Sequence, residues 1–201
     1  LAATADKILA GGGLCETVPL DVTDAKSIAS VEAIGVTDIL VNNAGIVRDA
    51  AALDQREEDW DAVMDTNLKG MFLMSQAVGR AMRSRGGGGS IINIASILGL
   101  RQAGGVTPYA VSKAGAIQMT KSLALEFARF GVRVNALAPG YLDTELNADF
   151  WQTDAGKAIW RDIDQCGQRV REAALQGMDA GERAQLLTLL ERVRDNLNSP
   201  T

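Results

Sequence analysis

The sequence of 201 residues contains no histidine and only two cysteines, Cys15 and Cys166. Without histidine, a Ser-His-Asp triad is excluded, as are most zinc sites. The two cysteines lie far apart in the chain, which argues against a disulfide framework or a CxxC site and favours a cytoplasmic location. We therefore expect no metal centre, and any catalysis must depend on other side chains.

Excess positive charge and long hydrophobic runs are also lacking. The net charge is −5, which argues against a nucleic-acid-binding surface. No apolar run is long enough to span a membrane, and the first residues do not resemble a signal peptide. With 47% hydrophobic and 22% charged residues, the chain can form a buried core. Its length predicts one α/β domain, or one domain with a short appendage.

The stretch Ser90–Lys113 contains the clearest chemical pattern. It predicts a buried strand that ends at Ser96, a glycine-rich loop, and a helix that begins at Tyr109. One helical turn places Tyr109 and Lys113 on the same face. An ammonium group beside a phenol lowers the pKa of that phenol, and the Ser96 hydroxyl could bind the same substrate oxygen. The pattern indicates a proton-transfer site for a carbonyl or an alcohol.

The rest of the chain alternates between predicted helices and strands, as in an α/β fold with a parallel sheet. We expect helices over residues 1–10, 27–34, 57–85 and 109–130, and strands over residues 15–22, 39–41, 91–96 and 132–138. The strand over residues 39–41 is all apolar and is expected to be fully buried. The glycine runs 11–13 and 86–89 each follow a helix, so they are interpreted as turns and not as phosphate-binding loops.

Five motifs occur in a particular order. They are LDVTD (Leu20–Asp24), NNAG (Asn42–Gly45), NLKG (Asn67–Gly70), Ser96 with Tyr109-x-x-x-Lys113, and PGYLDT (Pro139–Thr144). Together they resemble the short-chain dehydrogenase/reductase family over roughly the first three quarters of the chain. The resemblance implies a Rossmann-like, doubly wound parallel sheet. It also implies that the first βαβ unit and the last strand are missing, so the chain looks like a fragment truncated at its N-terminus.

The resemblance also assigns functional residues. It implies that Tyr109 is the general acid/base, that Ser96 orients the carbonyl oxygen, and that Lys113 lowers the phenol pKa and binds the nicotinamide ribose. Asn67, within a kinked helix, would hold a water for proton relay. The cofactor is NAD or NADP, and its expected contacts are Asp21, Val22, Asn43, Ala44, Gly45, Tyr109, Lys113, Pro139, Gly140, Leu142 and Thr144.

Three of these positions also have structural interpretations. Asp24 suits the N-cap of the helix near residue 25 better than Asp21 does. Asn42 is expected to connect neighbouring strands. Asn67 lies in an apolar stripe, where an unpaired amide would cost about 1–3 kcal/mol, so it could be a core asparagine satisfied by backbone groups. The relay role and the core role are compatible.

The last fifty residues do not match the family. We expect a boundary between a partial Rossmann-like domain over residues 1–150 and a helical tail of different origin over residues 151–201. Two helices are predicted, Ala155–Leu175 and Ala180–Leu197, and Asp179 with Glu182 forms a capping box for the second. The apolar face of that helix consists of Leu186, Leu187, Leu190, Val193 and Leu197. The tail is similar to the dimerisation helices of MarR-type regulators.

The leading hypothesis is an oxidoreductase that transfers a hydride between a nicotinamide cofactor and a small carbonyl or secondary alcohol. Residues Gly45–Asp49 are similar to those of 3-oxoacyl-thioester reductases. The related sugar and polyol dehydrogenases have similar sequences, so the substrate is weakly specified. A homo-oligomer is expected. The alternative is a non-catalytic remnant whose C-terminal helices mediate self-association. A hydrolase with a Ser96–Lys113 dyad would leave Tyr109 and the other motifs unexplained.

Overall fold

The computed structural model describes residues 2–31, 35–140 and 152–198. The chain divides into two compact units, Leu1–Leu142 and Asp143–Thr201. The expected boundary between residues 150 and 151 stays a prediction. In the first unit the elements are α1 (Ala2–Ala10), α2 (Ala25–Ser30), β1 (Ile39–Asn42), α3 (Glu57–Met64), η2 (Asp65–Gly70), α4 (Met71–Arg85), β2 (Gly89–Ile94), η3 (Ile97–Gly99), α5 (Thr107–Phe127), η4 (Ala128–Phe130) and β3 (Val132–Leu137).

The sheet of the first unit has three strands in the order β1-β2-β3, and both pairs are parallel. In register, Asn42 lies opposite Asn93, and Ile94 lies opposite Leu137. Parallel neighbours need a crossover connection, which α3, α4 and α5 supply. The predicted Rossmann-like parallel sheet is therefore confirmed, and the carboxyl ends of its described strands lie along one edge.

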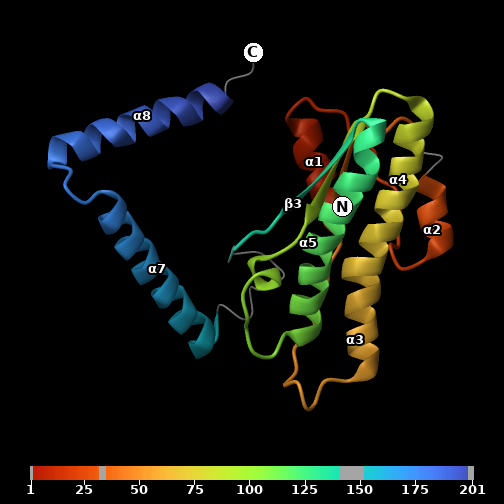
Figure 1. Cartoon of the computed structure of the whole chain (residues 1–201), viewed down its shortest axis with the longest axis horizontal. Coiled ribbons are helices and arrows are strands. Elements are labelled where there is room, and N and C mark those ends of the chain that lie inside the picture. The colour runs from red at the N-terminus through yellow and green to blue at the C-terminus, as the bar shows by residue number, and fades with distance from the viewer. Residues whose placement is uncertain (1, 32–34, 141–151, 199–201) are drawn as a thin grey trace. The chain divides into compact units, whose positions relative to one another are not determined.

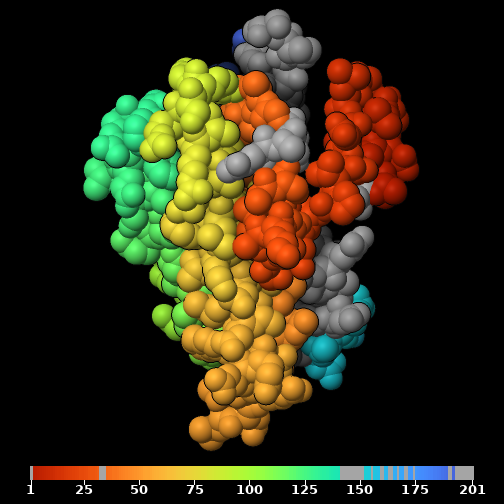
Figure 2. All heavy atoms as spheres, turned by 90° about the vertical axis from the view of Figure 1, so that its right-hand side faces the viewer, coloured from red at the N-terminus to blue at the C-terminus, as the bar shows by residue number. Residues whose placement is uncertain are grey.

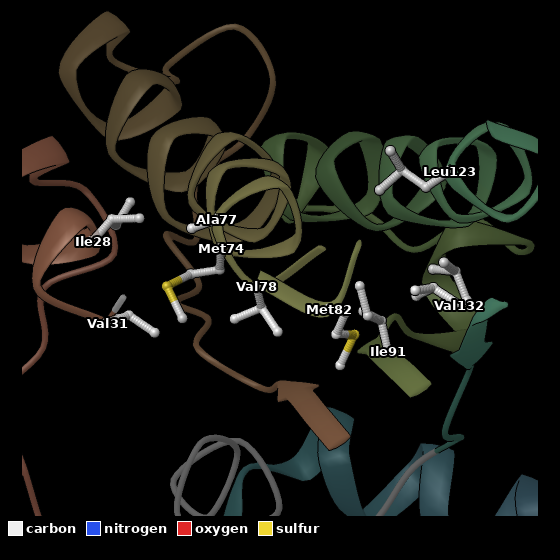
Figure 3. Close-up of a cluster of buried hydrophobic side chains, with 10 residues drawn as sticks. Ile28, Val31, Met74, Ala77, Val78, Met82, Ile91, Leu123 and Val132 are labelled. Atoms are coloured by element: carbon white, nitrogen blue, oxygen red, sulfur yellow. The ribbon is translucent and has the colours of Figure 1, made fainter. Parts of the chain in front are cut away.

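Helices α4 and α5 pack against the sheet, and α3 lies beside α5 (Figure 1). Figure 2 shows α3 and α4 running along one side of this unit with the end of α5 next to them. The core between helices and sheet includes Met82 of α4, Leu123 of α5, and Ile91 and Val132 of the strands (Figure 3). These side chains are apolar and buried, so their removal from water is the main favourable term for this packing.

The helix expected over residues 57–85 is interrupted by the π-helical segment η2, Asp65–Gly70. Short π segments within helices widen one turn and occur often at functional sites. Here the widened turn carries the buried Asn67. It also ends at Gly70, where a Cβ atom would lie 2.7 Å from the Val22 carbonyl oxygen. Only glycine permits this approach between η2 and the segment that follows residue 20.

The expected strand over Cys15–Val22 is wrong. Residues 13–21 form no strand in the structure, although the residue types of this segment predicted one. A strand requires a neighbour whose backbone amides and carbonyls complete its hydrogen bonds, and each strand of the described sheet pairs only with another of the three. Residue type alone favoured a strand, but pairing decides whether one forms.

The expected full burial of the strand at residues 39–41 is also wrong. Ile39 and Val41 of β1 are 62% and 53% exposed, whereas Leu40 between them packs against the core. β1 lies at the edge of the three-stranded sheet, and alternate side chains of a strand point to opposite faces. Helix α4 covers the face of Leu40, and the side chains of Ile39 and Val41 on the other face are exposed.

In the second unit, α7 (Asp154–Ala174) and α8 (Ala180–Asn198) agree with the two predicted helices. The capping box is confirmed: Asp179 Oδ1 accepts from the Glu182 amide at 2.9 Å, and the Asp179 amide donates to Glu182 Oε2 at 2.9 Å. On the predicted apolar face, Leu187 is exposed, and the side chains of Leu190, Val193 and Leu197 lie outside the described residues. Within the described part of the chain, no helix is both long and apolar enough to cross a membrane.

A chain of buried polar side chains runs through the first unit from α4 to α5. Asn42 donates to Ser75 Oγ of α4 and to Asn93 Oδ1 of β2, both at 2.9 Å. Asn93 in turn donates to Thr120 Oγ1 of α5 at 2.9 Å. The prediction that Asn42 connects neighbouring strands is confirmed. Because every donor has a partner, these groups can be buried without an unpaired polar atom.

Replacing the central member of this chain should destabilise the first unit. Asn93→Ala removes the acceptor of an Asn42 amide proton and the donor to Thr120 Oγ1, which keeps its bond to the Ala116 carbonyl, so we expect the free energy of unfolding to fall by about 1–3 kcal/mol. Urea denaturation of the full chain measures it. Asn135→Ala, an exposed asparagine on the adjacent strand β3, is the control and should change the free energy by less than about 0.5 kcal/mol. Equal effects of the two substitutions would contradict the role given to the buried network.

Candidate active site

Three strand ends converge at the carboxyl edge of the sheet. β1 leads into Asn43, Ala44 and Gly45, β2 leads into Ser96, and β3 leads toward Gly140. The ends of β2 and β3 are joined beyond the ladder, because the Ala95 amide donates to Leu137 O at 2.7 Å and the Ile97 amide donates to Pro139 O at 2.8 Å. Ligands of open parallel sheets bind at this edge, so Asn43, Ala44, Gly45, Ser96 and Gly140 lie where such a ligand would be expected.

Ser96 lies near enough to Tyr109 to affect the pKa of its phenol. Ser96 is the N-cap of η3, and its Oγ accepts from the Leu98 amide at 3.1 Å. That bond fixes the side chain and leaves the hydroxyl proton available. Tyr109 lies in the first turn of α5, which begins at Thr107 and not at Tyr109 as predicted, with Pro108 in the first turn as is usual for helix starts. The Ser96 hydroxyl forms a hydrogen bond with Tyr109 that lowers the pKa of the phenol.

Lys113 lies one turn after Tyr109 and is buried. Its Nζ donates to the Ile94 carbonyl oxygen at 2.7 Å, at the end of β2, and lies 5.5 Å from the centre of the Tyr109 ring. Burial lowers the pKa of Lys113 to about 8, because a low-dielectric surrounding disfavours the charged form. The three groups predicted to share a pocket, a phenol, an amine and an alcohol, are therefore together.

The predicted direction of the Tyr109 pKa is wrong. We expected Lys113 to lower it, but burial raises the pKa of Tyr109, and only the hydrogen bond from Ser96 opposes that effect. The reason is geometric: Lys113 Nζ is directed to the Ile94 carbonyl, and its position over the Tyr109 ring is not a hydrogen bond to the phenol oxygen. In this state Tyr109 is held as a neutral phenol that can donate a proton.

Asn67 is fully buried in η2, and every polar atom of its amide has a partner. Its Oδ1 accepts from the Ile46 amide at 2.8 Å, and its Nδ2 donates to the Ile46 carbonyl at 2.9 Å and to Ser112 Oγ at 3.1 Å. The interpretation of Asn67 as a satisfied core asparagine is confirmed. Its role in holding a water for proton relay stays a prediction.

Gly45 lies where Asn67 and Lys113 approach each other. A Cβ atom on Gly45 would be 3.5 Å from Asn67 Oδ1 and 3.6 Å from Lys113 Nζ. These are ordinary contact distances, so the glycine leaves space between the two polar groups and the loop after β1. Asn43 and Ala44, just before it, are exposed at the same edge.

The remaining predicted cofactor residues are distributed along the chain. Asp21 is exposed and accepts from the Thr23 amide at 2.8 Å and the Thr23 hydroxyl at 2.7 Å, which lower the pKa of its carboxyl group. Asp24 accepts from the first amides of α2, so its predicted N-cap role is confirmed. Val22 packs against Gly70. Leu142 and Thr144 lie outside the described residues.

Sequence reasoning missed Ile46 and Ser112. Ile46 contributes both of its backbone polar groups to Asn67, and no residue type signals a backbone contact. Ser112 precedes Lys113 and is fully buried on the core face of α5. Ala114 is exposed, because the buried stripe follows Pro108, Ser112, Ala116, Thr120 and Leu123. A serine at helical spacing from apolar residues was the available signal.

The fold and the site together define a class: α/β proteins with a Rossmann-like sheet whose carboxyl edge carries a Ser–Tyr–Lys proton-transfer site. The chain belongs to the short chain dehydrogenase family, whose sequence model matches residues 1–155.

Characterised relatives agree with this assignment. The chain is 45% identical over 139 residues to a 3-oxoacyl-(acyl-carrier-protein) reductase of Thermotoga maritima, which covers 67% of this chain and 56% of the relative. It is 45% identical over 124 residues to a 2-dehydro-3-deoxy-D-gluconate 5-dehydrogenase of Escherichia coli, covering 60% of this chain and 49% of that one. The chain thus spans about half the length of the curated relatives it matches.

Solved structures show the same fold. A gluconate 5-dehydrogenase from Burkholderia cenocepacia, crystallised with NADP and tartrate, superimposes with a TM-score of 0.72 at 36% identity. The match covers 77% of this chain and 62% of that protein. The parallel sheet described above is therefore shared with a gluconate 5-dehydrogenase of known structure.

The lowered pKa of Lys113 predicts a specific dependence of stability on pH. Between about 8 and 10.5 the unfolded chain binds a proton at this lysine that the folded chain does not, so the free energy of unfolding should rise as pH increases from 8 to 10. Lys113→Met should remove this rise. Lys121→Met, an exposed lysine on the same helix, should keep it.

Urea denaturation at several pH values measures the slopes. A parallel pH dependence in the parent chain and in Lys113→Met would contradict the assigned shift. The range stops at pH 10 because the raised pKa of Tyr109 acts with the opposite sign above that value.

Proposed function

We propose that this chain serves a nicotinamide-dependent oxidoreductase reaction that interconverts a carbonyl group and a secondary alcohol. The observation that supports it is the contact between Tyr109 and Ser96, with the buried Lys113 one turn away. Such a trio serves proton transfer at a substrate oxygen. Family membership and the relatives described above are consistent with this reaction.

The proton chemistry depends on residues that the structure describes. Ser96 donates a hydrogen bond to the substrate oxygen and stabilises the negative charge that develops there. Tyr109, whose pKa burial raises, is protonated at neutral pH and donates that proton from Oη to the same oxygen. Lys113, with a pKa of about 8, is mostly charged at pH 7 and, held by the Ile94 carbonyl, would bind the nicotinamide ribose. For alcohol oxidation the proton moves in the opposite direction.

NAD or NADP would occupy the carboxyl edge of the sheet. The fit rests on three parallel strand ends at one edge, with Gly45 leaving space beside Lys113 Nζ and with Asn43 and Gly140 exposed there. Asn43, Ala44, Gly45, Lys113, Pro139 and Gly140 would hold the cofactor, with Asp21 and Val22 near its adenine end. When bound, the nicotinamide supplies or accepts the hydride.

The substrate class we propose is a 3-oxoacyl thioester. The residues after the NNAG motif, Gly45–Asp49, resemble those of 3-oxoacyl reductases, and one of the relatives carries that name. Other relatives are named as dehydrogenases of gluconate or a dehydro-deoxy-gluconate, so sugar acids are the second substrate class to be tested.

Cofactor binding and catalysis can be separated in one experiment. The purified chain should enhance the fluorescence of NADPH or NADH, and should oxidise the reduced cofactor when acetoacetyl-CoA or a keto-gluconate is added. Tyr109→Phe keeps the ring that packs beside Lys113 but removes the proton donor, so cofactor binding should persist while the rate falls by about 10²–10⁴-fold.

The control is Ser122→Ala, which removes an exposed hydroxyl, bonded to the Gln118 carbonyl, from the same helix. It should leave the rate unchanged. Absence of fluorescence change at millimolar cofactor would refute the proposed function, and an active Tyr109→Phe variant would refute the role of Tyr109.

A second proposal concerns assembly: two copies of the chain associate through α4 and α5. Between these helices lies a hollow of about 490 Å³ lined by Gly79, Arg83, Leu125, Phe127 and Phe130, among others. Leu125 is 82% exposed beside it. Arg80, Glu126 and Arg129 also line the hollow, so the proposed contact would combine exposed apolar groups such as Leu125 with charged side chains.

Light scattering on the full chain tests this assembly. Leu125→Lys should convert an oligomer to a smaller species, because a charge would be buried at the interface. Leu187→Lys, an exposed leucine on α8, is the control. If Leu187→Lys alone reduced the mass, association would instead occur through the C-terminal helices, whose similarity to MarR-type dimerisation helices stays a prediction.

A further inference from the structure

Ser112 occupies an unusual position for a serine. It lies in α5 between Tyr109 and Lys113 and is fully buried. Its hydroxyl donates to the Tyr109 carbonyl oxygen at 2.7 Å, and its Oγ accepts from Asn67 Nδ2 at 3.1 Å. One small side chain thus joins the helix that carries Tyr109 and Lys113 to the π-helical segment η2.

The Ser112 hydroxyl affects which way the Asn67 amide points. In the observed orientation, Oδ1 accepts from the Ile46 amide and Nδ2 donates to the Ile46 carbonyl and to Ser112 Oγ. If the amide were rotated by half a turn, its NH₂ group would face the Ile46 amide. Its oxygen would face the Ile46 carbonyl and a serine oxygen whose proton is already donated to Tyr109. Each of these contacts would be repulsive, so Ser112 and Ile46 select one orientation.

The selected orientation places Asn67 Oδ1 toward Lys113. The space above Gly45 is bounded by Asn67 Oδ1 and Lys113 Nζ, 3.5 and 3.6 Å from the position that a Cβ would take. In the rotated amide, a donor would border this space in place of the acceptor. An acceptor at this point favours the charged form of Lys113, and a donor would disfavour it.

We propose that Ser112 is a positioning residue, which acts through Asn67 to hold an amide oxygen at the space above Gly45 that Lys113 Nζ also borders. The hydrogen bonds of Asn67 and Ser112 connect the loop after β1, η2 and α5. They therefore also fix the distance between the Asn67 amide and the turn of α5 that carries Tyr109. Its importance for proton transfer rests on the proposed function, but the hydrogen bonds can be tested without any cofactor.

Nuclear magnetic resonance of the nitrogen-15-labelled full chain tests these hydrogen bonds directly. Asn67→Asp identifies the Asn67 side-chain amide signals by removing them. In the parent chain these protons should exchange with water more slowly than those of Asn135, which is exposed. Ser112→Ala should shift the Asn67 signals and speed their exchange about 2- to 10-fold, as expected for loss of one hydrogen bond.

Two controls separate positioning from a general loss of stability. Ser122→Ala removes a serine hydroxyl from the same helix, but that hydroxyl contacts only the Gln118 carbonyl, at 3.3 Å, and is exposed. It should leave the Asn67 signals unchanged. The amides of Asn42 and Asn93 belong to the separate network with Ser75 and Thr120, and their signals should not move in Ser112→Ala.

The proposal is overturned if Asn67 exchanges as fast as Asn135 in the parent chain, or if its signals in Ser112→Ala coincide with those in Ser122→Ala. Should the chain reduce a carbonyl substrate, Ser112→Ala should lower kcat and leave KM unchanged, whereas an effect on KM alone would contradict the positioning role. A chain that binds no nicotinamide but shows the Asn67 response would refute the proposed function and retain this inference.

Discussion

The parallel pairing of β1, β2 and β3 is the constraint on which the rest of the first unit depends. Because all described strands run in one direction, the segments that follow them emerge at one edge, and residues separated by up to a hundred positions in sequence become neighbours there. Ser96 follows β2, and Gly45 follows β1. The third component, the turn of α5 that carries Tyr109 and Lys113, is held to the end of β2 by the bond from Lys113 to Ile94.

Buried polar groups then fix the site more precisely than apolar packing could. Apolar contacts are not directional, whereas an amide in a low-dielectric interior must face its partners. Asn42 and Asn93 connect the strands to each other and to the flanking helices. Asn67, nearer the candidate site, connects η2 to the backbone of Ile46 in the loop after β1. The two networks fix the strand ends and the π-helical turn. The side chains of the candidate site are attached to these elements or next to them, so their positions are fixed as well.

Much of the site was predictable from local pattern. The spacing of Tyr109 and Lys113 implies a shared helix face, and the parallel α/β order implies that Ser96 lies near them. The two helices of the second unit and the capping box at Asp179 were predictable for the same reason, since helix starts depend on contacts within one turn. Local pattern did not predict that residues 15–22 lack a strand, because a strand forms only with a neighbour that is distant in sequence. The exposure of Ile39 and Val41 followed from the position of β1 at the sheet edge, which no local pattern shows.

The sequence by itself determined the chemistry that is available: no histidine, a phenol and an amine one turn apart, and a family of motifs that indicates the parallel sheet. Only the tertiary structure decided the state of those groups. Burial raises the pKa of Tyr109 and lowers that of Lys113. Lys113 Nζ donates its hydrogen bond to the Ile94 carbonyl and not to the phenol. It also decided that Ser112 and the Ile46 backbone hold Asn67. The physical reason is that desolvation and hydrogen-bond direction depend on what surrounds a group in space, which the order of residues specifies only through the complete fold.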